Sequence, residues 1–477
     1  MKSLGLFLAA SLAACAGGGP VGPIPKVAVP SSFREVSPSA GTTSQPVTGA
    51  EWWVVFRDPV LDSLVKLAAK NNHDVLIAAS RVAEARASAG IARSALLPEI
   101  GHNTSLSHIR GGFSQGVVRV GDGYSGARSS FVSPFETSIL QGGLLARWEI
   151  DLFGGLRKMH NAAKADALAA EETQRDVLLV VTAEVARNYV EFRGIHQQIA
   201  IVEQNCDAQG EMLRLTRVRA EAGLATELDV ERQAAQLALT EAAVPALETA
   251  KARSLHRLGV LAGEEPGALL TELEKAQPLP TMPADIPSGL PSDLLKRRPD
   301  IRRAEAEITA ATARAGAART DLFPKIVFTG FTGRQATDVS GLTLGAGNFF
   351  GFGPGVQIPL FTGGRIRSNI AVHQERLRQA LRHYEQEVLA AFEETENALV
   401  AYRHEQDRRA SLAGAVSASR NAVGLARDVY LAGLGDFLSV LEAQRSQFAA
   451  EAELQRSETA LRSSLIALFK ALGGGIQ

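Results

Sequence analysis

The feature that most constrains the fold is an internal repeat that divides the chain into two halves. Three segments occur twice, in the same order and at offsets of 208 to 226 residues. Because the order is preserved, the sequence predicts a tandem duplication of one supersecondary unit. The pairs are DVLIAASRVAEARASAGIARSALLPEI (74–100) with DIRRAEAEITAATARAGAARTDLFPKI (300–326), WEIDLFGGLR (148–157) with VQIPLFTGGR (356–365), and AGLATELDV (222–230) with AGLGDFLSV (432–440).

Each half predicts the same order of elements. An alanine-rich helix (60–96 and 300–322) ends at a proline, and a strand follows it. A loop rich in glycine and serine (111–135 and 333–347) separates this strand from a second, returning strand. The expected organisation is a first repeat at 51–264, a linker or equatorial segment at 265–290 and a second repeat at 291–477.

The returning strands alternate apolar and polar residues, which is the pattern of membrane β-barrel strands, although a half-buried strand of a soluble sandwich alternates in the same way. Four strands per chain leave an open-edged sheet, and unpaired edge groups are not tolerated in lipid. Since about eight strands form the smallest packed barrel, four cannot enclose a lumen. A membrane sheet of this kind must be shared between chains. The apolar positions are Leu144, Ala146, Trp148, Ile150 and Leu152, and then Val356, Ile358 and Leu360.

Very long helices follow the returning strands. The sequence holds no proline from 135 to 244 or after 359, and apolar residues recur at spacings of three and four in both stretches. The 66 residues from Leu156 to Glu221 would span roughly 100 Å as one helix. Both halves then break at Ala-Gly-Leu and return through 226–262 and 436–472. An ordinary coiled-coil hairpin is the alternative interpretation of this pattern.

The N-terminus predicts export and lipidation. MKSLGLFLAASLAAC has one positive residue, an apolar stretch and a cysteine directly after it, which predicts a signal peptide at 1–14 and a lipidated Cys15. The alternative is an ordinary secretory signal with an incidental cysteine. Residues 15–50 are rich in proline, glycine and serine and predict an extended tether. Cys206 is the only other cysteine, so no disulfide framework is expected.

Motifs that resemble catalytic or cofactor sites lack their structural context. The GxSxG match at 112–116 and the GxGxxG match at 121–126 lie in a predicted loop, without the strand and helix that each motif needs. The nine histidines show no metal-ligand spacing. A net charge of −1 gives no basic excess for nucleic acid. We therefore expect no enzyme activity, no cofactor, no metal and no nucleic-acid partner.

These features together resemble the outer membrane factor family of TolC-like efflux ducts, in particular its lipoprotein (NodT-type) branch. The phrase YLAGLGDFLSVLEAQ (430–444) carries the most specific part of the resemblance. It implies a membrane β-barrel plus all-α fold, in which three chains share a twelve-stranded barrel that a periplasmic α-helical barrel continues. It also implies a passive exit duct, held as a homotrimer in outer-membrane lipid and joined to a periplasmic adaptor and an inner-membrane pump. The alternative function is a periplasmic lipoprotein coiled-coil adaptor or scaffold.

The resemblance also implies a constriction at the periplasmic end. In TolC-like ducts, acidic side chains just past the helical turn surround the narrowest point. The matching positions here are Ser439 and Glu442, of which only Glu442 keeps a carboxylate. The repeat offset gives Asp229 and Arg232 in the first half. Glu442 could instead be a solvated helix residue, or an ion pair with Arg232 or Arg445 could hold the helices together.

The turns themselves are candidate contacts for an adaptor. Gly223 and Leu224 in the first half correspond to Gly433 and Leu434 in the second. The glycine can adopt a positive φ, and the leucine beside it would be exposed. An exposed apolar residue at a helical tip suggests docking to an adaptor hairpin, and a helix-cap contact is the alternative.

Overall fold

The computed structural model describes residues 30–34, 42–43, 51–114, 132–275, 277–283, 286–287, 291–336 and 347–474. Cys15 and the GxGxxG match at 121–126 lie outside these ranges. The chain divides into two compact units. The sheet unit includes Ala85–Asp166 and Ile308–Gln379, and the helical unit includes Ala167–Glu307 and Ala380–Gln477.

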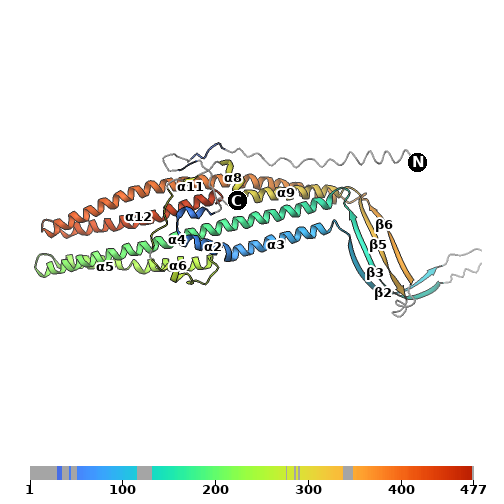
Figure 1. Ribbon diagram of the computed structural model, residues 1–477, viewed down its shortest axis with the longest axis horizontal. Helices are drawn as coiled ribbons and strands as arrows, with labels where there is room; N and C mark the ends of the chain where they lie inside the picture. The colour runs from blue at the N-terminus through green and yellow to red at the C-terminus, as the bar shows by residue number, and fades with distance from the viewer. Residues whose placement is uncertain are drawn as a thin grey trace, which may run out of the picture. The chain divides into compact units, whose positions relative to one another are not determined.

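The sheet unit contains four antiparallel strands in the order β2-β3-β5-β6 (Figure 1). The two strands of each repeat form a hairpin, and β3 joins β5 through pairs that include Ala146 with Gly330 and Ile150 with Ile326. Among the described residues, β2 and β6 therefore each pair along one side only. The strands are β2 (Glu99–Ser114), β3 (Val132–Ile150), β5 (Lys325–Ala336) and β6 (Gly347–Gln357).

The predicted strand limits are wrong in both hairpins. β3 ends at Ile150, before the expected Leu152, and β5 continues into the predicted loop as far as Ala336. The second returning strand was expected to run through Ile358 and Leu360, but β6 ends at Gln357. Pro359 has no N–H group to donate to a neighbouring strand. In the first hairpin, β2 and β3 extend into the predicted loop as far as Ser114 and from Val132. Glycine weakens a strand, but the hydrogen bonds of a paired neighbour hold it in the ladder.

Two helices dominate the chain and have the same length. Both α4 (Gly155–Glu221) and α11 (Arg365–Leu431) contain 67 residues, so the prediction of very long helices is confirmed. In the second half α12 (Phe437–Ala471) returns without a break. In the first half the return consists of α5 (Glu227–Glu241) and α6 (Val244–Leu261), because Pro245 cannot donate an N–H to the carbonyl of Glu241. None of the described helices has the length and apolar character of a candidate membrane span.

The helix predicted at 60–96 is in fact two helices, α2 (Pro59–Asn71) and α3 (His73–Ser94). Asn72 separates them. Its Oδ1 accepts hydrogen bonds from the N–H groups of Asp74 and Val75, and its Nδ2 donates to the carbonyl of Leu261 at 2.9 Å. The buried amide thus caps α3 and ties it to the end of α6. The second half has the equivalent pair, α8 (Pro291–Arg297) and α9 (Pro299–Thr320).

The core of the helical unit lies where the two repeats meet. Trp52, in a short 3₁₀ helix (η2, Trp52–Phe56), stacks on Phe469 of α12 with ring centroids 5.5 Å apart. The predicted tether is not free throughout, because Phe33 is buried in this core and the N–H of Arg34 donates to Glu396. The remaining elements are β1 (Thr42–Thr43), which pairs with β4 (Ile286–Pro287), and α7 (Leu270–Leu273).

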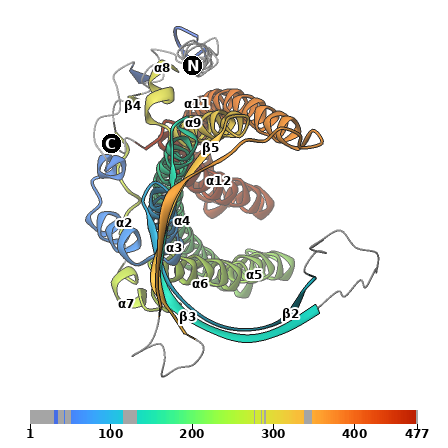
Figure 2. The same cartoon turned by 90° about the vertical axis from the view of Figure 1, so that its right-hand side faces the viewer.

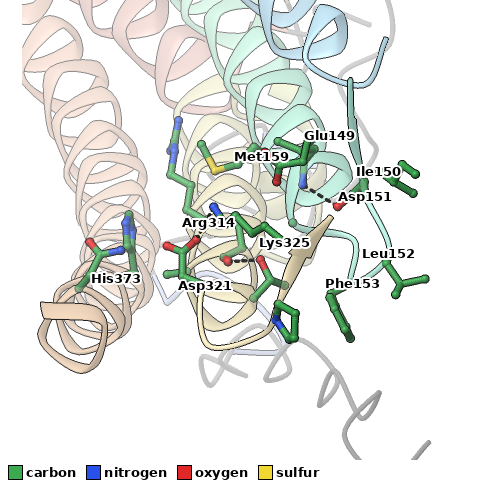
Figure 3. Close-up of a pocket in the computed structure, with 17 residues that line it drawn as sticks. Glu149, Ile150, Asp151, Leu152, Phe153, Met159, Arg314, Asp321, Lys325 and His373 are labelled. Atoms are coloured by element: carbon green, nitrogen blue, oxygen red, sulfur yellow. Dashed lines mark hydrogen bonds and ion pairs between the residues drawn. The ribbon is translucent and has the colours of Figure 1, made fainter. Parts of the chain in front are cut away.

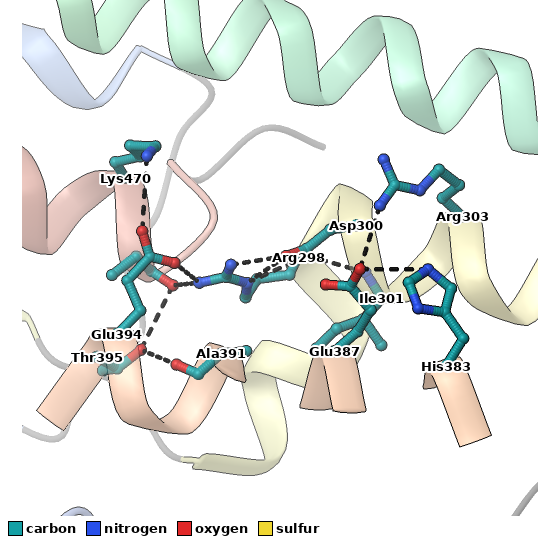
Figure 4. A network of polar contacts seen from close by, with 11 residues as sticks. Arg298, Asp300, Ile301, Arg303, His383, Glu387, Ala391, Glu394, Thr395 and Lys470 are labelled. Carbon is teal, nitrogen blue, oxygen red and sulfur yellow. Dashed lines mark hydrogen bonds and ion pairs between the residues drawn. The ribbon is translucent and has the colours of Figure 1, made fainter. Parts of the chain in front are cut away.

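A largely buried arginine, Arg298, ties together three helices of the second repeat (Figure 4). Arg298, between α8 and α9, forms ion pairs with Asp300 at 2.6 Å and with Glu394 of α11 at 2.7 Å. It also donates to the carbonyl of Ala471 at the end of α12 at 2.8 Å. Burying a charge is unfavourable unless it is paired and hydrogen-bonded, and Arg298 meets both conditions. Its contacts fix the start of α9, the middle of α11 and the end of α12 relative to one another.

Candidate functional site

Each long hairpin ends in the same glycine turn. Gly223 has φ of +72° and Gly433 has φ of +77°. The next N–H in each turn, from Leu224 or Leu434, donates back to the carbonyl of Arg219 at 2.8 Å or of Val429 at 3.0 Å. This is a Schellman-type cap, which requires a left-handed residue. The two leucines are 65% and 81% exposed, so neither is covered by a helix-cap contact. Their role in binding a partner stays a prediction.

Two of the four predicted constriction residues, Asp229 and Ser439, form hydrogen bonds with the N-cap residues of the returning helices. Asp229 forms a capping box with Thr226: the Asp229 carboxylate accepts from the N–H and the hydroxyl of Thr226, and the Thr226 hydroxyl accepts from the N–H of Asp229. In the second half, Ser439 donates its N–H and its hydroxyl to Asp436 at 2.9 and 2.8 Å. These hydrogen bonds give both side chains polar partners within the first turn of their own helix. A contribution of either residue to a constriction stays a prediction.

The other two residues, Arg232 and Glu442, are exposed. The hydrogen bonds from the N–H and hydroxyl of Ser439 lower the pKa of Asp436, and the charge of Arg232 lowers it further. Arg445 donates to the amide of Gln236 at 2.7 Å and so links α12 to α5. Within the described chain Glu442 has no hydrogen bond or ion pair, so neither of the two suggested arginine pairs forms inside one chain.

A small apolar cluster holds the ends of the two hairpins together. Tyr430 and Phe437 pack edge to face with centroids 5.4 Å apart. The guanidinium of Arg219 lies 4.8 Å from the centre of the Tyr430 ring and donates to the carbonyl of Leu431 at 3.2 Å. The last turns of α4 and α11 and the first turn of α12 are therefore joined at one point. The buried members of this tip cluster are Met212, Tyr430, Phe437, Val440 and Leu441.

A groove of about 460 Å³ lies between the two turns. Leu224 and Leu438 line it together with the charged side chains of Asp229, Arg232 and Asp436. The groove therefore offers apolar surface beside charges of both signs. Such a surface suits a protein partner that presents an apolar anchor with a polar rim. The two turns that line the groove lie 210 residues apart in the sequence, and the hairpins bring them together at one end of the helical unit.

One face of the sheet is mainly apolar and the other mainly polar, with Arg334 and Asn348 on the first and Val327 on the second as exceptions among others. Residues that face each other across an antiparallel pair point to the same side, so the registers assign every side chain to one of two faces of a curved sheet (Figure 2). The apolar face carries Ile100, Leu106, Leu144, Trp148, Phe328, Phe350, Phe352 and Val356. The polar face carries Glu99, Asn103, Ser105, Gln141, Arg147, Glu149, Thr329 and Gln335.

The corner between β3 and α4 contains a pocket of about 280 Å³ (Figure 3). Asp151 accepts hydrogen bonds from the N–H groups of Leu156 and Arg157 and so caps the first turn of α4. Lys325 pairs with Asp321 at 3.0 Å. These contacts fix the change of direction from strand to helix. No set of three or more His, Cys, Asp or Glu in the described part of the chain is arranged to hold a metal ion.

The GxSxG match has no catalytic geometry. Gly112 and Ser114 belong to strand β2, where they pair with Pro134 and Val132. A nucleophile elbow instead places its serine on a sharp turn between a strand and a helix. The match is therefore part of a regular hairpin.

An amphipathic antiparallel sheet and two helical hairpins, each with a first helix of 67 residues and a glycine end turn, are typical of a channel-forming protein of the outer membrane. The family model described as "Outer membrane efflux protein" matches residues 64–264 and 290–474. The chain belongs to this family, as the sequence resemblance predicted.

Individual relatives agree with this assignment. The chain is 34% identical over 426 residues to the probable efflux pump outer membrane protein SepC of Pseudomonas putida, covering 89% of this chain and 85% of SepC. It is 32% identical over 481 residues to the pyoverdine export outer membrane protein OpmQ of Pseudomonas aeruginosa, covering 100% and 98%. The solved outer-membrane channel OprN matches with a TM-score of 0.85 and 32% identity, covering 97% of this chain and 99% of OprN.

These findings confirm the predicted fold class, the location in the outer membrane and the role as an exit duct for efflux. The alternative of a periplasmic adaptor or scaffold is wrong, because the family match covers both repeats and the relatives are outer membrane proteins. The relatives are named as efflux and export proteins.

Proposed function

We propose that three copies of this chain form a passive duct through the outer membrane. The observation that carries the proposal is the pair of half-paired edge strands, β2 and β6, on a sheet with one apolar and one polar face. In lipid an open edge would leave N–H and C=O groups unsatisfied. Pairing β6 of one chain with β2 of the next satisfies both edges. Three chains then give twelve strands, with the apolar face toward lipid and the polar face toward an aqueous lumen.

The helical hairpins extend the duct into the periplasm, where an adaptor and an inner-membrane pump complete the system. The names of the relatives, which are outer membrane components of efflux pumps, support this assignment. We place the adaptor contacts at Gly223, Leu224, Gly433 and Leu434, because these turns are exposed and flank one groove. The pump supplies the energy, so the duct itself needs no cofactor.

At the constriction, three copies of Glu442 would lie near the axis of the trimer. Each carboxylate is exposed and lacks a partner within its own described chain. A ring of carboxylates favours cations, as charged rings do in channels. Arg232 of the first repeat contributes the opposite charge nearby. Asp229 and Ser439 support the constriction through their hydrogen bonds with Thr226 and Asp436, the N-cap residues of the helices that carry it.

The oligomeric state tests the proposal directly. Purified full-length protein in mild detergent is expected to have the mass of a trimer by light scattering corrected for detergent. Edge pairing makes this assembly obligatory, so a monodisperse folded monomer contradicts the shared barrel. The measurement does not depend on knowing the substrate.

Two variants separate docking from conduction. Leu224→Asp combined with Leu434→Asp is expected to abolish efflux while trimers still form. Leu239→Asp is the matched control, since Leu239 is 66% exposed on α5 but lies away from the turns. Glu442→Ala is expected to change cation preference or conductance in planar bilayers while adaptor binding survives. Unchanged conductance and selectivity would place the constriction elsewhere.

A further inference from the structure

One apolar cluster interrupts the polar face of the sheet. Leu145 of β3, Phe331 of β5 and Phe349 of β6 point to this side, as the strand registers require. Leu145 lies directly opposite Phe331, and Phe331 lies directly opposite Gly351. The immediately adjacent positions on the same face are polar or glycine, and they include Arg147, Thr329, Gly143 and Gly333. We call Leu145, Phe331 and Phe349 the lumen patch.

Glycines on the neighbouring strands determine how the two rings lie. A Cβ atom at Gly351 would stand 2.5 Å from the ring of Phe331, and one at Gly333 would stand 2.7 Å from the ring of Phe349. Each ring therefore lies across the glycine of the adjacent strand, against the wall of the sheet. The two ring centroids are 6.1 Å apart with an interplanar angle of 37°. The rings form one shallow aromatic surface and do not project straight out of the sheet.

This surface is open to solvent on its outer side. Leu145 is 46% exposed, Phe331 is 44% exposed and Phe349 is half-buried. The apolar face also has exposed phenylalanines, Phe350 and Phe352 at 78% each, but those face the side that the proposed duct turns toward lipid. Contact with lipid does not explain the apolar residues on the polar face, because a contiguous apolar surface there would meet water. Exposed apolar clusters with a polar rim mark binding sites.

We propose that the lumen patch is a transit site for planar aromatic solutes, present three times around the duct. The inference rests on the proposed function, which makes the polar face the wall of the lumen. Aromatic solutes stack on ring faces in offset or edge-to-face geometry, and the glycine floor leaves those faces accessible. The charged neighbours on this face, Arg147 and Glu149, have opposite signs. The patch therefore recognises solutes by their flat apolar shape and favours neither sign of net charge.

Planar bilayers allow a direct test. Ethidium, a planar aromatic probe, is added to wild-type trimers, and the duration of its current blockades is measured. Phe331→Ser combined with Phe349→Ser is expected to shorten these events about tenfold, a change typical of losing stacking contacts. The matched control is Phe350→Ser with Phe352→Ser, which removes two rings from the opposite face and is expected to leave the blockade duration unchanged.

A second pair of variants separates stacking from coverage of the glycines. Phe331→Leu with Phe349→Leu keeps apolar bulk over Gly351 and Gly333 but removes the flat ring faces. We expect the same shortening as with serine. Wild-type blockade in the leucine variant, or in the serine variant, overturns the proposal, because the rings would then only cover the glycines. An absence of any unitary conductance in wild-type trimers would instead contradict the proposed duct.

Discussion

Tyr430→Ala is expected to open the periplasmic end of the duct. Tyr430 is 5% exposed and contacts Phe437, the guanidinium of Arg219 and the rest of the tip cluster. Truncating a buried aromatic residue costs about 3–5 kcal/mol, of which the cation–π contact is about 0.5–1 kcal/mol. Since about 1.4 kcal/mol changes an equilibrium tenfold, the balance between closed and open tips shifts by about a hundredfold or more. The cluster has few other buried members to compensate.

Tyr430→Phe is the matched control. The hydroxyl of Tyr430 is buried and makes no hydrogen bond to another described residue. Removing a buried polar group that lacks a partner is neutral or slightly stabilising, and the ring contacts with Phe437 and Arg219 remain. We therefore expect Tyr430→Phe to conduct like the wild type in planar bilayers and Tyr430→Ala to show larger or longer openings. Detergent-resistant trimers on a gel would show that both variants still assemble.

Two results would refute this reasoning. If Tyr430→Phe opens the duct as far as Tyr430→Ala, the hydroxyl holds the tip closed through a bond to another chain, and packing is not the cause. If Tyr430→Ala conducts like the wild type, the tip cluster does not contribute to closure at all.

Three further predictions concern the anchor and the helical unit. Cys15→Ser is expected to abolish palmitate labelling while trimers still form, because the sheet itself holds the protein in the membrane; label in the variant would contradict this. Burial, and then the charge of Asp300, raises the pKa of Asp176 above its ordinary value of 3.8. The protonated Asp176 carboxyl therefore contributes to the free energy of unfolding at low pH, and this contribution is lost as pH rises through the raised pKa. Asp176→Asn should therefore raise the unfolding temperature at pH 7 but not below pH 3.8, and an equal gain at both pH values would exclude titration as the cause. Arg298→Ala leaves Asp300 without its ion-pair partner and Glu394 with only the longer contact to Lys470 at 3.6 Å. It is expected to cost about 3–5 kcal/mol in thermal unfolding, and Arg298→Lys should not rescue it because the paired fork is lost.

The long helices were predictable because their signals are local. Two stretches without proline, each with apolar residues three and four positions apart, predicted helices that the structure gives as 67 residues each. Glycine turns after them were predictable for the same reason, since a positive φ at Gly223 and Gly433 is a property of one residue type. The break between α5 and α6 in the first half follows from Pro245, which is also a local signal in the sequence.

Contacts between distant segments were not predictable. Asn72 interrupts a helical pattern because its amide reaches Leu261, which is 189 residues away. Phe33 sits in a segment whose composition indicates a tether, yet the core of the helical unit buries it. Asp229 aligned with a constriction position, and only the capping geometry with Thr226 shows what else the carboxylate does. The lumen patch was missed because alternation alone does not tell which glycine lies opposite which ring.

The sequence by itself determined the element order, the duplication and the class of protein. The spacing of apolar residues in helices, their alternation in strands and the matching segments of the two repeats can all be recognised in short stretches of sequence. Only the tertiary structure decided the register of β3 against β5, which pairs Leu145 with Phe331 across 186 residues of chain. A shift of one residue would move Phe331 to the other face of the sheet. Register is set by the sum of all cross-strand hydrogen bonds and side-chain contacts, so no single segment contains it.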